Sequence, residues 1–265
     1  MRRSLIVAAC AAGLLGLAGC KGSVPTPERS PTPSPSPSAT ADQTRQVTER
    51  LSAAVRKLAA TSFRFEGGSG IVRIDGTFDP RKHRGEATGS FGVGSGDIRI
   101  IGSELYVKGL ADKPDDWLRV RTGRLAPGNA LAQIADPTVI TGYLTAIGTA
   151  TQSGPGRYSG TIDLAALTRR AATSTRYEGL LTLLGANPSA ATFEARTDSA
   201  GRLTDLSVTV PESSGTVGTT LTTRYSDFGV AVDVARPPAA RVEEAPDQLY
   251  ALLAPTASAS PSSTP

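Results

Sequence analysis

Few side chains in this sequence could do covalent chemistry, and the most informative of them is a cysteine near the N-terminus. The chain of 265 residues has two cysteines, Cys10 and Cys20, and a single histidine, His83. Cys20 follows Leu-Ala-Gly at 17–19, and its thiol is a potential nucleophile for attaching an acyl-bearing group. The small residues before it would let a peptidase reach the preceding peptide bond. The pattern predicts cleavage and covalent modification at Cys20.

The first 19 residues have the parts of an export signal. Arg2 and Arg3 supply positive charge, and residues 5–16 form an apolar run shorter than the roughly 20 residues that a membrane-spanning helix needs. Leu-Ala-Gly-Cys at 17–20 resembles the lipobox of bacterial lipoprotein signals. The alternative is an ordinary secretory signal, which would leave Cys20 as a lone thiol outside the cell.

The lipobox resemblance implies that residues 1–19 are removed as a signal peptide and that Cys20 carries a diacylglycerol and an acylated amine. Two or three acyl chains anchor a protein stably, so we expect attachment to the outer, extracytoplasmic face of the cell membrane. Because Cys10 leaves with the signal and Cys20 is acylated, the folded part has no disulfide. Its own core must therefore stabilise it.

Composition divides the mature chain into a spacer, one domain and a tail. Residues 20–44 hold the acylated cysteine and a segment rich in Pro, Ser and Thr, including Ser-Pro-Thr-Pro-Ser-Pro-Ser-Pro at 30–37. Alternating prolines favour an extended, polyproline-like chain that cannot bury enough surface to fold. Residues 45–255 are long enough for one domain with a sizeable core. Residues 256–265 form a second Pro/Ser/Thr segment, which we expect to be disordered.

The charge of the chain does not favour a nucleic-acid partner. The net charge is +4, and Arg2 and Arg3 of the signal contribute two of the positive charges. No cluster of Lys and Arg follows the signal, so the sequence lacks the basic patch of a nucleic-acid-binding protein. The abundance of Ala, Gly, Thr, Pro and Arg is typical of a GC-rich genome, such as that of an actinobacterium.

The polar residues of the domain do not form the pattern of an active site. His83 lies in the stretch Arg-Lys-His-Arg at 81–84, where we expect an exposed residue, and no Gly-x-Ser-x-Gly sequence supplies a nucleophile. Acidic residues at 112–116 and 243–244 lack the spacing of metal ligands. The glycine-rich stretch 92–96 predicts a hairpin loop. We therefore predict no enzyme activity, no cofactor and no metal site, and a hydrolase with a cryptic site is the least favoured alternative.

Hydrophobic periodicity predicts an α+β domain that begins with a helix and continues mainly as strands. Apolar residues recur every three or four positions over 47–58, and the period then changes to two, with Gly-rich turns typical of an antiparallel meander. The predicted strands are 62–66, 71–78, 84–91, 96–101, 104–108, 117–120, 156–164, 191–197, 203–210, 218–228 and 230–235. The further predicted helices are 129–135, 138–147, 164–172, 177–184 and 246–253.

Several stretches of the domain together resemble one protein family. Thr-Ser-Phe-Arg-Phe at 61–65 follows the first helix, and Ile-Gly-Ser-Glu-Leu-Tyr-Val-Lys at 101–108 precedes Trp-Leu-Arg-Val at 117–120. The most specific stretch is Tyr-Ser-Asp-Phe-Gly at 225–229, which a short predicted strand and the proline pair 237–238 follow. Together they resemble the actinobacterial lipoproteins of the LppX, LprA, LprF and LprG family over most of the domain.

This resemblance implies a single curved antiparallel sheet, a half-barrel, with helices covering its concave face, similar to the LolA and LolB lipoprotein carriers. In the family, the space between sheet and helices holds acyl chains, and several members carry or transfer envelope lipids and lipoglycans. The chain departs from the family in its long spacer, its C-terminal tail and its Gly- and Thr-rich middle region.

If helices cover such a cavity, their apolar faces should line it. The residues expected to contact a ligand there are Leu131, Ile134, Ile140, Tyr143, Leu144 and Ile147. Trp117 is the only tryptophan, and we expect it either to anchor the core of the sheet or to lie at the rim of the cavity.

The expected function follows from the signal and the resemblance together. The protein would be a monomeric, membrane-anchored lipoprotein that binds the acyl chains of an envelope lipid or lipoglycan and assists its transport, with a membrane transporter as a further partner. Acyl chains would leave the bilayer for a dry cavity of similar polarity. The alternative is a structural or adaptor lipoprotein with a filled core, which binds an envelope protein through its surface. The volume of the cavity distinguishes the two.

Overall fold

The computed structural model describes residues 37–70, 72–90, 95–109, 115–126, 129–184, 191–210 and 218–252. The predicted signal peptide, Cys20, most of the predicted spacer, the tip of the predicted glycine-rich hairpin and the C-terminal tail lie outside the described residues. Within the described ranges, no helix is both long and apolar enough to cross a membrane.

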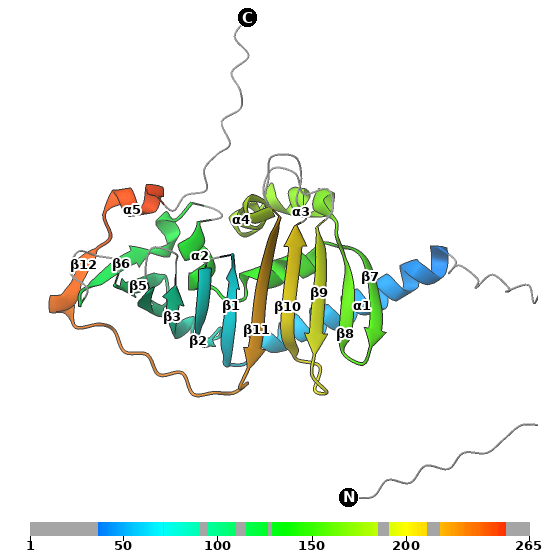
Figure 1. Cartoon of the computed structure of the whole chain (residues 1–265), viewed down its shortest axis with the longest axis horizontal. Coiled ribbons are helices and arrows are strands. Elements are labelled where there is room, and N and C mark those ends of the chain that lie inside the picture. Colours follow the sequence, from blue (N-terminus) through cyan, green and yellow to red (C-terminus); the bar gives the residue numbers. More distant parts are fainter. Residues whose placement is uncertain are drawn as a thin grey trace, which may run out of the picture. The chain divides into compact units, whose positions relative to one another are not determined.

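The described part of the chain is an α+β unit built on one large, unclosed sheet of 12 strands (Figure 1). Its order is β12-β6-β5-β4-β3-β2-β1-β11-β10-β9-β8-β7. Neighbours are antiparallel except β12, which pairs with β6 in parallel. The strands are β1 (Phe63–Ser69), β2 (Val72–Asp79), β3 (Arg84–Ser90), β4 (Ser95–Ile101), β5 (Glu104–Lys108), β6 (Trp117–Arg121), β7 (Ile147–Gly154), β8 (Arg157–Ile162), β9 (Thr192–Thr197), β10 (Leu203–Val210), β11 (Thr219–Ser226) and β12 (Val242–Glu244).

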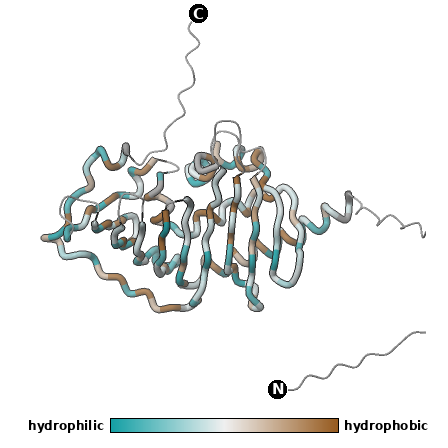
Figure 2. Tube along the Cα trace, viewed as in Figure 1, coloured by the Kyte–Doolittle hydropathy of each residue, from teal (hydrophilic) through white to brown (hydrophobic). Residues whose placement is uncertain are grey.

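The first six strands form the predicted meander, in which each strand pairs with the next. Their two faces follow from alternation. In β1, Phe63 and Phe65 are buried while Arg64 and Glu66 are exposed. Figure 2 shows the same change between hydrophobic and hydrophilic residues along neighbouring strands. We call the face that carries Phe63 and Phe65 the core face, and the opposite face the outer face.

The second group of strands joins the first because β11 pairs with β1. The chain passes from β6 through helical segments to β7 and β8, and after two further helices it forms β9, β10 and β11. The helices are α1 (Pro37–Ala59), α2 (Ala130–Ala135), α3 (Leu164–Ala171), α4 (Thr175–Leu184) and α5 (Asp247–Leu252), with 3₁₀ turns η1 (Thr122–Arg124), η2 (Val139–Thr145) and η3 (Ala239–Arg241).

Helix α1 packs on the core face, against β7, β10 and η2. Its buried residues Val47, Leu51, Ala54 and Leu58 follow the predicted helical spacing. In Figure 1 the helix crosses behind the strands of the second group. The hydroxyl of Thr44 lies against the outer edge of β7, where it accepts a hydrogen bond from the Ala150 N–H (3.1 Å) and donates to the Ala150 carbonyl (3.4 Å).

Five segments differ from the sequence-based expectation. Helix α1 begins at Pro37 instead of near residue 45, so residues 37–44 of the predicted spacer are helical. Proline is tolerated at the first helical position because the N–H of that position has no intrahelical partner. Part of the predicted helix 138–147 is the 3₁₀ turn η2, and Ile147 instead begins β7, a strand that the sequence did not predict. The predicted strand 230–235 forms no ladder, and the unpredicted β12 follows it.

Residues 230–238, which we call the strap, lead from β11 toward β12 (Figure 1). Its valines pack on residues of β4, β5 and β6 on the outer face. Buried and exposed residues do alternate along the strap: Val234 is buried and Val232 is half-buried, and their neighbours are exposed. These valines pack against the side chains of a strand face instead of pairing with a strand, which is why the alternation alone predicted a strand wrongly. The strap begins where Ser62 donates to the carbonyl of Val230 (2.6 Å).

The two faces of the sheet therefore carry separate hydrophobic clusters. The main core lies on the core face and combines residues of α1, α2, η2, α3 and α4 with those of the strands. The second cluster lies on the outer face under the strap, and its buried members are Ile101, Tyr106, Trp117 and Val234.

Candidate functional site

An apolar pocket of about 250 Å³ lies between the core face of the sheet and the segment formed by α2 and η2. One wall comes from β1, β2 and β11 and includes Phe65, Ile74 and Leu221. The facing wall comes from α2 and η2 and is formed by Ile134, Pro137, Val139, Ile140 and Tyr143.

Local sequence explains the wall formed by α2 and η2. Buried Asn129 begins α2, and its side chain accepts a hydrogen bond from the Leu131 N–H (2.9 Å). Asp136 ends α2 in an extended conformation, as is usual before a proline. Its carboxylate then accepts from the N–H (2.9 Å) and the hydroxyl (2.6 Å) of Thr138, which fixes the start of η2. The turn Asp136-Pro137-Thr138 thus directs both short helices toward the sheet.

Two buried tyrosine hydroxyls hold this wall in place. Tyr225 of β11 donates to the carbonyl of Pro137 (3.0 Å), and Tyr143 of η2 donates to the carbonyl of Leu180 in α4 (2.7 Å). Burial raises the pKa of both phenols above the ordinary value, so both stay protonated donors. The Tyr143 ring lines the pocket while its hydroxyl is already occupied. The wall is therefore attached both to the sheet and to α4.

The chemistry of the pocket is that of a binding site for a nonpolar group. None of its lining residues has an ionisable carboxylate, amine, guanidinium or imidazole group, and the polar groups near it are hydroxyls of Ser69, Thr219, Thr222 and Thr223. Nothing in this lining offers a nucleophile with a base. Across the described ranges, no group of three or more His, Cys, Asp and Glu side chains is placed to hold a metal ion.

The structure brings three of the predicted ligand contacts together. Ile134, Ile140 and Tyr143 line the pocket. Leu131 and Leu144 are buried in the main core away from the pocket lining, and Ile147 is half-buried at the start of β7.

Trp117 lies on the opposite face of the sheet from these residues. It is buried in the second cluster under the strap, with the Arg99 guanidinium carbon 4.7 Å from its ring centroid. It therefore anchors hydrophobic packing on the outer face, and it does not lie at the rim of the apolar pocket.

The sequence-based set missed the wall of the pocket formed by the sheet. Phe65 and Leu221 are both inward residues of alternating strands, a signal that the sequence contains. Their proximity depends on the pairing of β1 with β11, which joins segments about 160 residues apart and has no local signature.

His83 differs from its expected exposed position. It is half-buried in the turn between β2 and β3, with φ of 47°, and its ring meets Phe78 edge-on at 5.6 Å between centroids. The reason is the left-handed conformation of this turn, which folds the imidazole back onto the end of β2. No acidic or nucleophilic partner of the His83 side chain is found among the described residues.

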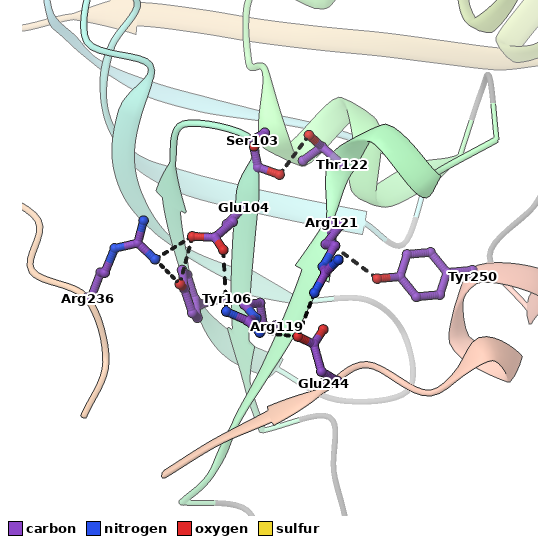
Figure 3. A network of polar contacts seen from close by, with 9 residues as sticks. All are labelled: Ser103, Glu104, Tyr106, Arg119, Arg121, Thr122, Arg236, Glu244 and Tyr250. Carbon is purple, nitrogen blue, oxygen red and sulfur yellow. Dashed lines mark hydrogen bonds and ion pairs between the residues drawn. The ribbon is translucent and has the colours of Figure 1, made fainter. Parts of the chain in front are cut away.

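The main charged network of the protein lies on the outer face, around the end of the strap (Figure 3). Arg236 of the strap contacts Glu104 and donates to the Tyr106 hydroxyl (2.7 Å), which in turn donates to Glu104 (3.0 Å). Arg119 contacts both Glu104 (3.5 Å) and Glu244 of β12. The network therefore connects the strap, β5, β6 and β12.

The pKa values of the two carboxyls in this network are lowered. Partial burial alone would raise the pKa of Glu104, but the hydrogen bonds from Tyr106 and Arg236 and the nearby charge of Arg119 outweigh it. The pKa of Glu244 is held below its ordinary value mainly by the hydrogen bond from Arg119, with a further contribution from Arg121. The network is thus strongest when both carboxyls are ionised.

No protein-family model matches the chain, and no curated protein matches it.

Proposed function

We propose that the protein binds a single acyl chain in the apolar pocket between β1, β2, β11 and the α2–η2 segment. The observation that carries the proposal is the pocket itself, with an apolar lining on both walls and no ionisable side chain of Asp, Glu, Lys, Arg or His. Hydrocarbon needs no charged partner, so a largely apolar pocket of this kind is suited to it. The binding would require no chemical step, and we propose no enzyme activity.

The size of the pocket limits the length of acyl chain that it can hold. Its volume of about 250 Å³ is below the roughly 300–1,000 Å³ of typical small-molecule sites. With about 30 Å³ for each water-sized group, it takes on the order of eight methylene groups. At about 0.8 kcal/mol per buried methylene, such a segment contributes roughly 6 kcal/mol. The pocket therefore suits part of one chain and has no room for the full length of several.

We further propose the finer architecture that the family resemblance suggests. In this proposal the sheet is curved as a half-barrel, and α1, α2, η2 and α4 cover its concave side. The positions of α1 and η2 on the core face support it. The pocket would then be the remaining space between these layers, widened when the α2–η2 wall separates from the sheet.

The lipobox resemblance gives the proposed setting. Cys20 would be acylated, and the protein would be held on the outer face of the cell membrane as a cell-envelope lipoprotein. The Pro/Ser/Thr segment would separate the domain from the bilayer. Lipid would then move between the membrane and the pocket, with an envelope lipid or lipoglycan as the cargo and a membrane transporter as its supplier.

A chain-length series tests the proposal. The probes are saturated fatty acids of 6 to 16 carbons, offered to residues 21–265 of the chain without detergent and measured by calorimetry. Affinity should rise about fourfold with each added methylene up to about eight to ten carbons and then level off, because further methylenes stay outside. An affinity that does not change with chain length, or no binding at all, would contradict acyl binding in this pocket.

A pair of matched variants locates the binding. Val139→Phe places a larger side chain in the pocket wall, whereas Val232→Phe makes the same change on the strap, under which the second cluster lies. We expect loss of fatty-acid binding in Val139→Phe and binding within twofold of the parent chain in Val232→Phe. Equal behaviour of the two variants would place the bound chain elsewhere. Mass spectrometry of organic extracts from the same proteins, made in an actinobacterial host, would identify the natural lipid.

The adaptor function is the second candidate, and one observation favours it. Among the described residues, many side chains of the core face are almost completely buried, Leu131 and Leu144 among them. A protein that keeps a stable, lipid-free fold in the experiments above would be assigned to this class, and the search would turn to protein partners of its surface.

A further inference from the structure

An open groove of about 780 Å³ lies on the outer face, across β2, β1, β11, β10 and β9. The strap does not reach this half of the outer face. In Figure 1 this half faces the viewer, with α1 behind it. The proposed acyl site lies on the other face of the same strands. The groove therefore needs its own explanation.

Strand register explains the shape of the groove. A row of directly paired residues crosses the sheet with long side chains at its ends, Glu194 and Arg73, and short ones between them, Ser207, Thr222 and Gly68. Gly68 has to be a glycine, because a Cβ there would collide with the carbonyl oxygen of Val72. The short side chains in the middle of the row form the bottom of the depression.

The next row along the strands forms a charged side wall. Its members are paired in the order Arg196, Asp205, Arg224, Glu66 and Asp75. Arg224 forms an ion pair with Asp205 (3.3 Å). Glu66 and Asp75 lie directly opposite each other, an arrangement of like charges that costs stability in a sheet.

Most of the charged side chains of the groove have no ion-pair partner. Among the described residues, Glu66, Arg73, Asp75, Glu194 and Arg196 form none, although groups of opposite charge stand on neighbouring strands. This contrasts with the network under the strap, in which each carboxylate is shared between two arginines. The donors and acceptors of the groove are therefore free to meet a ligand.

The chemistry of the lining selects the ligand class. Four carboxylates and three guanidinium groups nearly balance, so neither a strongly anionic nor a strongly cationic ligand is favoured. No aromatic side chain lines the groove, so a flat aromatic ligand has no stacking partner. Carboxylates accept, guanidinium groups donate, and the hydroxyls of Ser207, Thr220 and Thr222 do both. Sugar hydroxyls also donate and accept, and they match this mixture.

From this arrangement we infer that the open groove on the outer face is a binding site for a neutral saccharide. The saccharide lies along the row from Glu194 to Arg73, over Ser207, Thr222 and Gly68, with its hydroxyls bonded to the charged side wall. Two sources share this chemistry: the headgroup of a lipid, and a free envelope glycan.

The position of the groove relative to the apolar pocket relates the inference to the proposed function. The two depressions share lining residues of three neighbouring strands, so they lie back to back across β1, β2 and β11. The shared residues are Gly67, Gly68, Ser69, Val72, Ile74, Thr222 and Thr223. A glycolipid with its acyl chain in the pocket would have its headgroup close to the groove, around the β1–β2 turn. The headgroup source rests on the proposed function, whereas the groove as a saccharide site does not.

A glycan array tests the groove directly. Labelled protein, residues 21–265, contains the whole compact unit that begins at Ser36 and is applied to an array of neutral and acidic oligosaccharides. We expect retention of a subset of neutral oligosaccharides that persists in 0.5 M NaCl. No retention, or retention of acidic glycans alone, would overturn the assignment.

Matched variants test whether a saccharide binds in the groove or elsewhere on the outer face. Thr220→Val and Arg73→Gln remove a hydroxyl and a guanidinium that line the groove and not the apolar pocket. Thr192→Val and Arg157→Gln make the same changes on the outer face of β9 and β8, outside the groove lining. The groove variants should lose about tenfold in affinity, as expected for one lost polar contact, while the controls stay within twofold. Equal affinities in the two sets would overturn the site, and unchanged melting temperatures would show that all four fold.

A final comparison separates the two sources and the two proposals. The retained sugar is titrated as the free oligosaccharide and as its octyl glycoside, below the micelle concentration. A gain in affinity from the octyl chain that disappears in Val139→Phe identifies a lipid headgroup. Sugar binding without any such gain identifies a free glycan and counts against the acyl proposal alone. Fatty-acid binding without sugar binding overturns the groove alone.

Discussion

The outer face of the sheet has two halves, which differ in how their side chains are covered and paired. Over β4, β5 and β6 the strap covers Trp117 and Tyr106, and ion pairs join Glu104, Arg119 and Glu244 around it. Over β1, β11, β10 and β9 nothing in the described ranges covers the face, and most charges in its groove are unpaired. In the half under the strap the side chains contact one another and stabilise the fold. In the half with the groove most charged side chains are available to bind a ligand. The two halves of this face therefore differ in how their charged side chains are partnered.

The largest effect should come from removing the hydrophobic centre of the covered half. Trp117→Ala deletes a ring that is 8% exposed and leaves a cavity beneath the strap. We expect the free energy of unfolding in urea to fall by about 3 kcal/mol. A loss below about 1 kcal/mol would mean that the strap packs loosely, and the contrast between the halves would weaken.

A smaller effect should come from the charged network around the strap. Glu104→Gln keeps the shape of the side chain but removes the charge that Arg236 and Arg119 share. We expect a loss of about 1 kcal/mol at low salt, which decreases in 0.5 M NaCl because part of the network is exposed to solvent. If the loss of stability does not depend on salt, Glu104 stabilises the fold through packing and not through its charge.

Acid should loosen the covered half. The pKa values of Glu104 and Glu244 are lowered in the folded protein, so their contribution to stability is present above the ordinary value near 4.5 and is lost as the pH falls through the folded-state pKa. Fluorescence of Trp117, the single tryptophan, should therefore change below about pH 4.5, before global unfolding. In Glu104→Gln this early change should be reduced. An identical acid profile in both proteins would contradict a role for Glu104.

The smallest effect on stability should come from the open half. Thr220→Val keeps a β-branched side chain at an exposed strand position and should change the free energy of unfolding by less than about 0.5 kcal/mol. The same substitution is expected to weaken saccharide binding. A large loss of stability would show that the groove is structural, which would remove the contrast between the halves.

How far the sequence predicted the fold depended on how local the signal was. The strands β1 to β6 and β8 to β11 have alternation and turns that can be read in place, and they were found. β7 was missed because its sequence Ile-Gly-Thr-Ala-Thr-Gln-Ser-Gly turns few large apolar side chains inward. β12 was missed because three residues pair in parallel with β6, about 120 residues earlier, and a contact of that kind leaves no local pattern.

The candidate site shows the same division. Helical periodicity identified Ile134, Ile140 and Tyr143, which do line the pocket. It did not find Phe65 or Leu221, since their meeting depends on the long-range pairing of β1 and β11. Trp117 shows a different limit of sequence-based prediction. Alternation along β6 places Trp117 and Leu118 on opposite faces of the sheet, but it does not show which faces are covered. The path of the strap decides that both faces of this strand are buried.

The contact between Thr44 and Ala150 has a consequence for how copies of the protein meet. An open sheet has two edges, and a free edge is a template on which another chain can add a strand. At one edge β12 is only three residues long. At the other, β7 has two irregularities in its register, and the Thr44 hydroxyl bonds both backbone groups of Ala150. If the protein is lipid-anchored as we propose, copies crowded in the plane of the membrane would meet often. The Thr44 side chain on α1 would then discourage them from joining edge to edge.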